Sequence, residues 1–171
     1  MELRQELQGA SKIREWANHY NVKEDIPIEN LVSDVKDRGY LKKRELIEVA
    51  RWKVPTGRNS VWRIETMSPT NVERITRDAF LLTDDSDRLR HLYKLEGVDS
   101  AIASAILHWF HNDRYPIWDK HARWSIQLAE DYCSNARWKA YTKFCRAIAN
   151  KYGMDMRTLD RALFQYGKSN S

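Results

Sequence analysis

The feature that most constrains the fold is the spacing of the apolar residues, which recur roughly every three to four positions along most of the chain. This period places them on one face of an α-helix, whereas a strand needs strict alternation. Only six glycines and four prolines interrupt the 171 residues, so the chain has few turn signals. The pattern therefore predicts an all-α protein.

Capping and turn residues divide this pattern into nine expected helices. Ser68 and Asp155 are expected to be N-caps, and Pro69 suits a first helical position. Residues 58–67 are assigned to no element. The expected helices are Glu2–Tyr20, Ile28–Arg38, Lys42–Lys53, Pro69–Leu82, Asp84–Leu95, Ala101–His111, Trp118–Asp131, Asn135–Lys151 and Met156–Tyr166.

Length and composition limit the class of protein. The 171 residues, 42% of them hydrophobic, favour one domain, or one domain split into two helical lobes with a cleft between them. With only two cysteines, Cys133 and Cys145, neither a disulfide framework nor a four-thiolate site is expected, and both thiols are expected in the core. The polar N-terminus and the absence of a long apolar run predict a cytoplasmic protein without a membrane span.

A glycine-containing turn, Leu95–Ser100 (LEGVDS), precedes a helix rich in small residues. Such a turn exposes backbone N–H groups, and the helix that follows adds the positive end of its dipole. Together they form a site for a phosphate oxygen, so Gly97, Val98 and Ser100 are candidate DNA contacts. The plainer alternative is that Gly97 only ends a helix. The net charge of +5 permits a polyanionic partner without requiring one.

Asp119 follows a loop that Pro116 constrains. When an N-glycosidic bond breaks, positive charge develops on the sugar, and a nearby carboxylate stabilises that charge and orients water. Asp119 is a candidate catalytic residue for a reaction of this kind. Its alternative role is to cap the helix that follows.

Taken together, residues Leu95–Ile126 resemble the helix-hairpin-helix DNA glycosylase superfamily, which includes the endonuclease III and adenine glycosylase types. The family pattern is Leu-x-Gly-Val-Gly, a small-residue helix, and a loop ending in Pro-apolar-x-Asp. The flanking helices agree only in being helices. The matching residues are Leu95, Gly97, Val98, Ala103, Ala105, Ile106, Leu107, Tyr115, Pro116, Ile117 and Asp119, with Arg123 where the family often has a basic residue.

The resemblance implies that residues 1–171 form one all-α, helix-hairpin-helix glycosylase-like domain. It implies a DNA glycosylase that releases a damaged or modified base, flipped out of double-stranded DNA, and leaves an abasic site. The role would lie in base excision repair or phage defence near the nucleoid, and no cofactor is needed. Ala101 stands where bifunctional members carry a Schiff-base lysine, which implies a monofunctional enzyme.

Asp99 departs from the family pattern, because it replaces the second glycine of the hairpin. Its negative charge should repel phosphate, and it can instead cap the next helix. Two further functions therefore stay open. One is a non-catalytic DNA-binding or adaptor protein on the same scaffold, and the other is a bifunctional glycosylase/AP lyase that uses Lys53 or Lys120.

The remaining candidates are cations and aromatic residues. We expect cations to contact phosphate and aromatic rings to line a base pocket. Most aromatic residues at helical spacing, however, belong to the core. The histidines and aspartates near Asp119 match no zinc motif, so no metal is expected. The further phosphate candidates are Arg51, Lys53, Lys120 and Arg123, and the base-pocket candidates are Trp52, Trp118 and His121.

Overall fold

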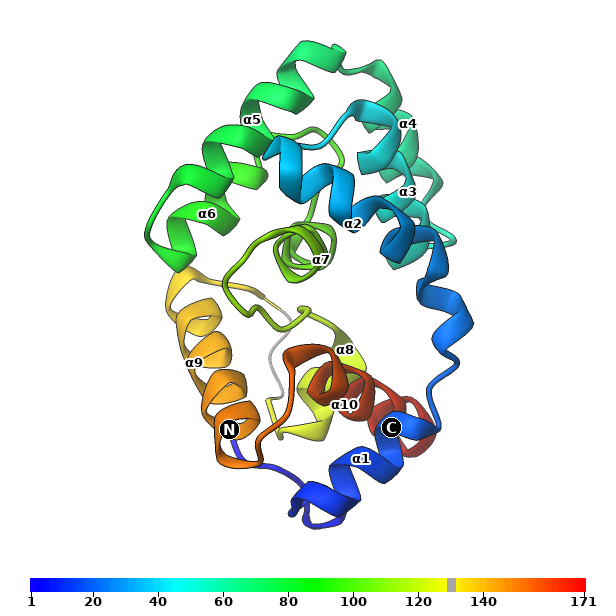
Figure 1. Ribbon diagram of the computed structural model, residues 1–171, viewed down its shortest axis with the longest axis vertical. Helices are drawn as coiled ribbons and strands as arrows, with labels where there is room; N and C mark the ends of the chain where they lie inside the picture. The colour runs from blue at the N-terminus through cyan, green and yellow to red at the C-terminus, as the bar shows by residue number, and fades with distance from the viewer. Residues whose placement is uncertain (129–131) are drawn as a thin grey trace. The chain divides into compact units, whose positions relative to one another are not determined.

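The computed structural model describes residues 1–128 and 132–171, and over these residues the chain contains ten α-helices, two short 3-10 helices and no strand (Figure 1). The all-α prediction is confirmed. The helices are α1 (Ala10–Asn18), α2 (Ile26–Arg38), α3 (Lys43–Lys53), α4 (Arg58–Thr66), α5 (Pro69–Leu81), α6 (Asp85–Leu92), α7 (Ser100–Phe110), α8 (Lys120–Ser125), α9 (Asn135–Lys151) and α10 (Met156–Asn170). The 3-10 helices are Gln5–Leu7 and Val22–Asp25.

The helices form two compact units. We call Met1–Asn21 with Arg114–Ser171 the terminal unit, and Val22–Asp113 the central unit. The predicted hairpin therefore belongs to the central unit, and the predicted catalytic carboxylate belongs to the terminal unit.

Helix α7 forms the middle of the central unit. It contacts α2, α3 and α6, and eight of its eleven residues are buried (Figure 1). A helix that is apolar on nearly every side is stable only when other helices surround it. The small side chains of Ala103, Ser104 and Ala105 allow those helices to approach closely.

Helix α10 organises the terminal unit, where it contacts α1, α8 and α9. Its buried face includes Leu159, Ala162, Leu163 and Tyr166, at the three- and four-residue spacing of an amphipathic helix. At Gly167 a side-chain β-carbon would collide with the backbone of His121, so α8 and α10 touch through a glycine.

Three expected N-terminal features of helices are confirmed. The Ser68 side chain accepts a hydrogen bond from the backbone of Asn71, Asp155 accepts one from Thr158, and Pro69 occupies the first helical position of α5. Asp99 caps α7 by accepting a hydrogen bond from the amide of Ile102 (2.9 Å), which is the alternative that its sequence position left open. Each of these capping side chains satisfies an amide that the helix leaves without an internal partner.

Some expected boundaries are wrong. The chain does not form one helix from Glu2 to Tyr20, because Gly9, at φ +127°, separates a 3-10 turn from α1. Helix α4 occupies a segment for which no helix was expected. The helix expected at Trp118–Asp131 spans only Lys120–Ser125, and residues 129–131 lie outside the described part. Helix α10 continues to Asn170, beyond its expected end at Tyr166.

Both cysteines are free thiols. Cys145 is fully buried, as expected, and burial raises its pKa well above the ordinary thiol value. Cys133 is only half-buried, so its expected place in the core is not observed. Within residues 1–128 and 132–171, no helix has the length and apolar character needed to cross a lipid bilayer.

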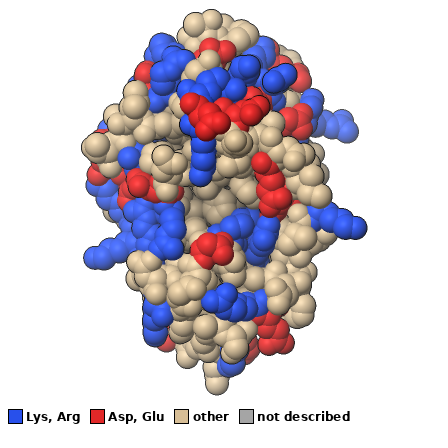
Figure 2. Space-filling view, in the orientation of Figure 1, with Lys and Arg blue, Asp and Glu red and all other residues tan. Residues whose placement is uncertain are grey.

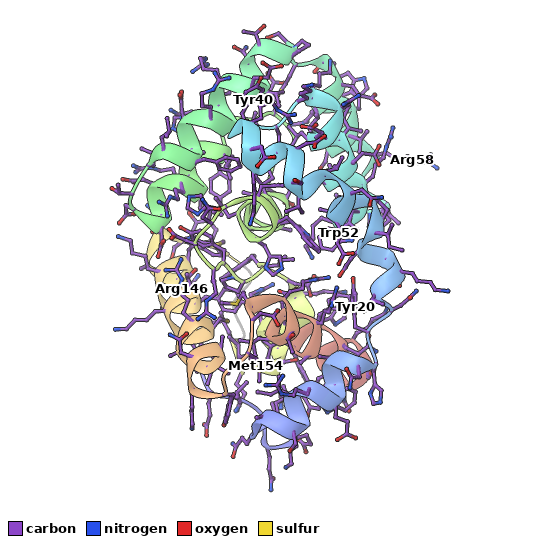
Figure 3. All side chains as sticks on the ribbon, in the orientation of Figure 1. Tyr20, Tyr40, Trp52, Arg58, Arg146 and Met154 are labelled. Atoms are coloured by element: carbon purple, nitrogen blue, oxygen red, sulfur yellow. The ribbon has the colours of Figure 1, made fainter. Side chains whose placement is uncertain are left out.

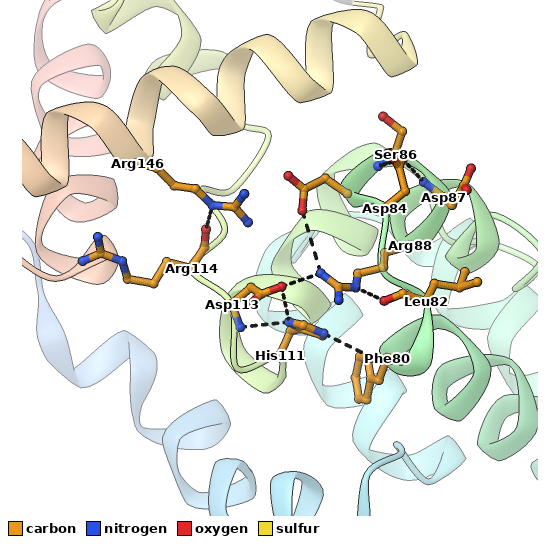
Figure 4. Close-up of polar contacts among 11 residues, drawn as sticks. Phe80, Leu82, Asp84, Ser86, Asp87, Arg88, His111, Asp113, Arg114 and Arg146 are labelled. Atoms are coloured by element: carbon orange, nitrogen blue, oxygen red, sulfur yellow. Dashed lines mark hydrogen bonds and ion pairs between the residues drawn. The ribbon is translucent and has the colours of Figure 1, made fainter.

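A buried arginine joins two segments of the central unit (Figure 4). Nε of Arg88 donates to the Leu82 carbonyl (2.6 Å), and its Nη1 donates to the Asp113 carboxylate (2.5 Å). His111 lies beside this pair, where Nδ1 accepts from the Asp113 amide (2.9 Å) and Nε2 lies 3.3 Å from the Phe80 carbonyl. These contacts require the neutral imidazole with its proton on Nε2.

We expect the free energy of unfolding to decrease as the pH falls below 6.5. Burial, with the charge of Arg88, holds the pKa of His111 below the ordinary value of 6.5. Below that pH the unfolded chain binds a proton that the folded chain does not, so stability declines until the folded-state pKa is reached. Urea unfolding at pH 7 and pH 5 measures the loss. It should be smaller in His111→Gln, and an equal loss in both proteins would contradict this assignment.

Candidate functional site

The predicted site residues fall into two groups, one in each unit. The central unit carries those of α3 and of the glycine turn, namely Arg51, Trp52, Lys53, Gly97, Val98 and Ser100. The terminal unit carries those that follow the proline loop, namely Trp118, Asp119, Lys120, His121 and Arg123.

Gly97 occupies a position that only glycine fits. Its φ is +80°, and a β-carbon there would lie 2.5 Å from the backbone oxygen of Ser60 in α4. Since α6 ends at Leu92, Gly97 does not simply terminate a helix. Helix α4 was not expected from the sequence. The sequence therefore did not predict the surface against which this turn packs.

A groove of about 430 Å³ lies between α4 and the glycine turn. Its lining is mixed, with one arginine and two carboxylates among polar and apolar side chains. Val98 is 8% exposed, so it serves mainly to anchor the turn. The lining residues are Asn59, Ser60, Arg63, Tyr93, Leu95, Glu96, Gly97, Val98 and Asp99.

Negative charge surrounds the turn. Glu96 and Asp99 are both exposed, and they flank Gly97 and Val98. Because the Asp99 carboxylate already accepts the Ile102 amide, one donor at the start of α7 is engaged within the protein. Both features weaken phosphate binding at this turn relative to a hairpin with two glycines.

Asp119 is the N-cap of α8. Its Oδ1 accepts hydrogen bonds from the amides of His121 (2.8 Å) and Ala122 (3.4 Å). The residue is half-buried, so its carboxylate is not sealed in the core. The capping role that the sequence left open is therefore real. It does not exclude a chemical role, because a cap fixes the position of the carboxylate.

Two buried side chains hold the loop that leads to Asp119. The amide of Ile117 donates to Oδ1 of Asp160 (3.1 Å), and the hydroxyl of Tyr141 donates to the Ile117 carbonyl (3.0 Å). Asp160 also receives Nη1 of Arg157 (2.6 Å). The peptide two residues before the carboxylate is thus fixed from both α9 and α10, which makes the position of Asp119 well defined.

Only a faint signal for this arrangement is present in the sequence. Asp160 lies between Leu159 and Leu163 on the apolar face of an amphipathic helix, where a carboxylate needs a partner. Tyr141 has the spacing of an ordinary core residue. Only the tertiary structure brings both side chains to Ile117.

Three predicted contacts next to Asp119 differ in exposure. Trp118 is 3% exposed and packs edge-to-face against Tyr141, with ring centroids 5.4 Å apart. The guanidinium of Arg123 lies 5.0 Å from the Trp118 ring, and Arg123 is 6% exposed. Lys120 is exposed on the surface. Lys120 is therefore the most accessible of the three to a phosphate.

His121 is held by the end of α10. Its Nδ1 lies 3.0 Å from Oγ of Ser171, and its ring meets Phe164 edge-on at 5.7 Å. Burial lowers the pKa of His121 below the ordinary histidine value, which favours the neutral imidazole near pH 7. A neutral ring beside Asp119 can donate or accept one hydrogen bond without adding charge.

The candidates on α3 have partners within the central unit. Arg51 pairs with Glu48 (3.1 Å) and Glu65 (3.8 Å), which offset its charge. Trp52, labelled in Figure 3, packs edge-to-face against Trp109 at 5.7 Å and stays half-exposed, while Lys53 is half-buried. Of the three, Arg51 is the most exposed, but two carboxylates offset its charge.

Charge is divided unequally between the units. Counted from the sequence, the terminal unit has fourteen Lys and Arg against eight Asp and Glu, a net charge of +6. The central unit has fifteen against sixteen, a net charge of −1. The excess positive charge of the protein thus belongs to the unit that carries Asp119.

In the part of the chain that the structure describes, no three His, Cys, Asp or Glu side chains form a group that could hold a metal ion. Comparison of the chain with family models, with curated proteins and with solved structures found no match. Two candidate features therefore rest on the residues of this chain alone, each within one unit. One is the half-buried carboxylate of Asp119 in the terminal unit, and the other is the glycine turn of the central unit.

Proposed function

We propose that this protein is a monofunctional DNA glycosylase of the helix-hairpin-helix type, with Asp119 as its catalytic carboxylate. The observation that carries the proposal is the way Asp119 is presented. It is half-buried at the start of α8, on a loop whose backbone is held by Asp160 and Tyr141, in the unit with net charge +6. The resemblance of Leu95–Ile126 to the glycosylase pattern supplies the reaction class.

The reaction follows from the charge of the carboxylate. The target base leaves with the electrons of the N-glycosidic bond, and the deoxyribose becomes a cation that resembles an oxocarbenium ion. The negative Asp119 stabilises this cation and accepts a proton from the water that attacks the anomeric carbon. The departing base takes up a proton from solvent and Asp119 then releases its own proton to solvent, so the products are a free base and an abasic sugar. A rigid carboxylate is favourable because it needs no reorganisation as the charge develops.

Base release from duplex oligonucleotides tests the proposal. A panel of damaged and modified bases is incubated with the protein, and alkali then cleaves the strand at abasic sites. We expect free base from at least one substrate, and strand breaks only after alkali. Breaks without alkali, together with borohydride trapping on Lys53 or Lys120, would show a lyase instead.

The second candidate is a DNA-binding protein without catalysis. It is favoured by the capping roles of Asp99 and Asp119, because each carboxylate has a structural use in this fold. It predicts binding to duplex DNA that weakens with salt, no base release from any substrate, and no effect of Asp119→Asn on that binding.

A further inference from the structure

Helix α9 carries an unusual set of charges. Its 17 residues include five cations and no acidic residue. Lys139, Lys143 and Lys151 are exposed, and Arg137 and Arg146 are half-buried. Figure 2 shows Lys and Arg side chains gathered over this helix. A surface helix usually mixes both signs of charge, so this one points to a negatively charged partner.

Three of these cations form a line. Lys139, Lys143 and Arg146 are spaced by four and three residues, which places them on one face of the helix. The buried residues of α9, Trp138, Tyr141, Thr142, Cys145 and Ala149, lie on a different face. Asn150 continues the same line, and its Oδ1 accepts a hydrogen bond from Arg114. We call Lys139, Lys143, Arg146 and Arg114 the α9 stripe.

The two arginines of the stripe are held in place (Figure 4). Nε of Arg146 donates to the Arg114 carbonyl (2.8 Å), and its guanidinium lies 4.7 Å from the Tyr115 ring. Arg114 also donates to the Met154 carbonyl (3.4 Å). These carbonyls and this ring are neutral, so the contacts orient the guanidinium groups without adding negative charge. Less side-chain entropy is then lost when an anion binds.

The length of the stripe suits a nucleic-acid strand. From Lys139 to Asn150 the helix rises by about 16 Å, at about 1.5 Å per residue. DNA carries one phosphate per about 3.4 Å of axis on each strand, so a duplex whose axis follows the helix presents about four or five phosphates of one strand over this length. The regular spacing of the cations matches a repeated anion better than a single one.

The stripe is also connected to the candidate carboxylate. Arg146 covers Tyr115, and Tyr141 of the same helix donates to the Ile117 carbonyl, two residues before Asp119. The glycine turn, in contrast, is flanked by exposed carboxylates. A strand held by α9 would therefore be fixed relative to the loop that bears Asp119.

We infer that the α9 stripe is the main phosphate-binding surface of this protein and that it holds the sugar-phosphate backbone of duplex DNA. This inference rests on the DNA partner of the proposed function, but it does not depend on base excision. It assigns most of the electrostatic binding to the terminal unit and a minor part to the glycine turn.

The test is the salt dependence of binding to an unmodified duplex oligonucleotide, measured by fluorescence anisotropy. In Lys139→Gln/Lys143→Gln we expect the slope of log affinity against log salt to decrease by about 2, and affinity at about 0.1 M salt to fall about 10- to 100-fold. The matched control is Lys23→Gln/Lys36→Gln, which removes the same charge from exposed lysines of the central unit. It should change the slope by less than about 0.5.

The outcomes separate this inference from base excision. Equal slopes for the stripe variant and the wild type would overturn it, as would a wild type that binds no duplex. An equal loss in the control variant would also overturn it, because the effect would then follow net charge alone. Binding that depends on the stripe, without base release from any substrate, would support the inference and reject the glycosylase. Tighter binding to RNA of the same length than to DNA would overturn the choice of partner.

Discussion

Asp119→Asn is expected to slow base release by at least about 100-fold while the protein stays folded. The substitution removes the negative charge that would stabilise the sugar cation. It keeps an N-cap, because asparagine caps helices as well as aspartate does. The side-chain oxygen can still accept the His121 and Ala122 amides, so α8 should begin at the same residue. Single-turnover rates of base release measure the effect, and far-UV circular dichroism confirms the fold.

Asp155→Asn is the matched control for this prediction. Asp155 caps α10 in the same unit and accepts the amide of Thr158 (2.8 Å), so the two variants make the same chemical change at equivalent helix positions. Base release should be unchanged in Asp155→Asn. If Asp119→Asn retains the wild-type rate on a substrate that the protein cleaves, Asp119 does not stabilise the reacting sugar.

Gly97→Ala is expected to lower the free energy of unfolding by about 2–5 kcal/mol, the largest stability effect that we predict. One part of the loss comes from the left-handed backbone at φ +80°, which a β-carbon disfavours. The other part comes from the collision with the Ser60 oxygen at 2.5 Å, which would push α4 away from the turn. Urea unfolding measures the total.

Gly39→Ala separates these two causes. Gly39 ends α2 at φ +77°, nearly the same backbone conformation, but a β-carbon added there would meet no other part of the described chain within 4 Å. The free energy of unfolding of Gly39→Ala should fall only by the conformational part, about 1–2 kcal/mol. If the two variants are equally unstable, the contact between the turn and α4 contributes nothing, and Gly97 is needed for its backbone angle alone.

The two units divide the tasks of the proposed enzyme in a way that the family resemblance alone does not suggest. The resemblance would place DNA binding at the glycine turn, but this turn carries Glu96 and Asp99, and the central unit has a net charge of −1. The terminal unit, with a net charge of +6, carries both Asp119 and the α9 stripe. Positive charge in the same unit as the carboxylate would attract a DNA backbone to the residue that is proposed to act on it.

Most of what the sequence could predict depends on interactions between residues close together in the chain. Helical periodicity indicated the all-α class, because each helix must bury one face wherever its partners lie. Capping chemistry predicted Ser68, Asp155 and the capping role of Asp99, because a cap depends only on residues three positions away. Glycine breaks were harder to interpret. Gly9 divides the first expected helix because its φ of +127° is a backbone state that the pattern of apolar residues does not reveal.

Contacts between residues distant in sequence were decided only by the tertiary structure. The need for glycine at position 97 depends on α4, and the fixed loop before Asp119 depends on Tyr141 and Asp160 from two later helices. The α9 stripe likewise needs Arg114, which comes from before α8. Such contacts depend on how the helices pack, and packing uses the whole core at once. A linear pattern records which face of a helix is buried, but not which partner it meets.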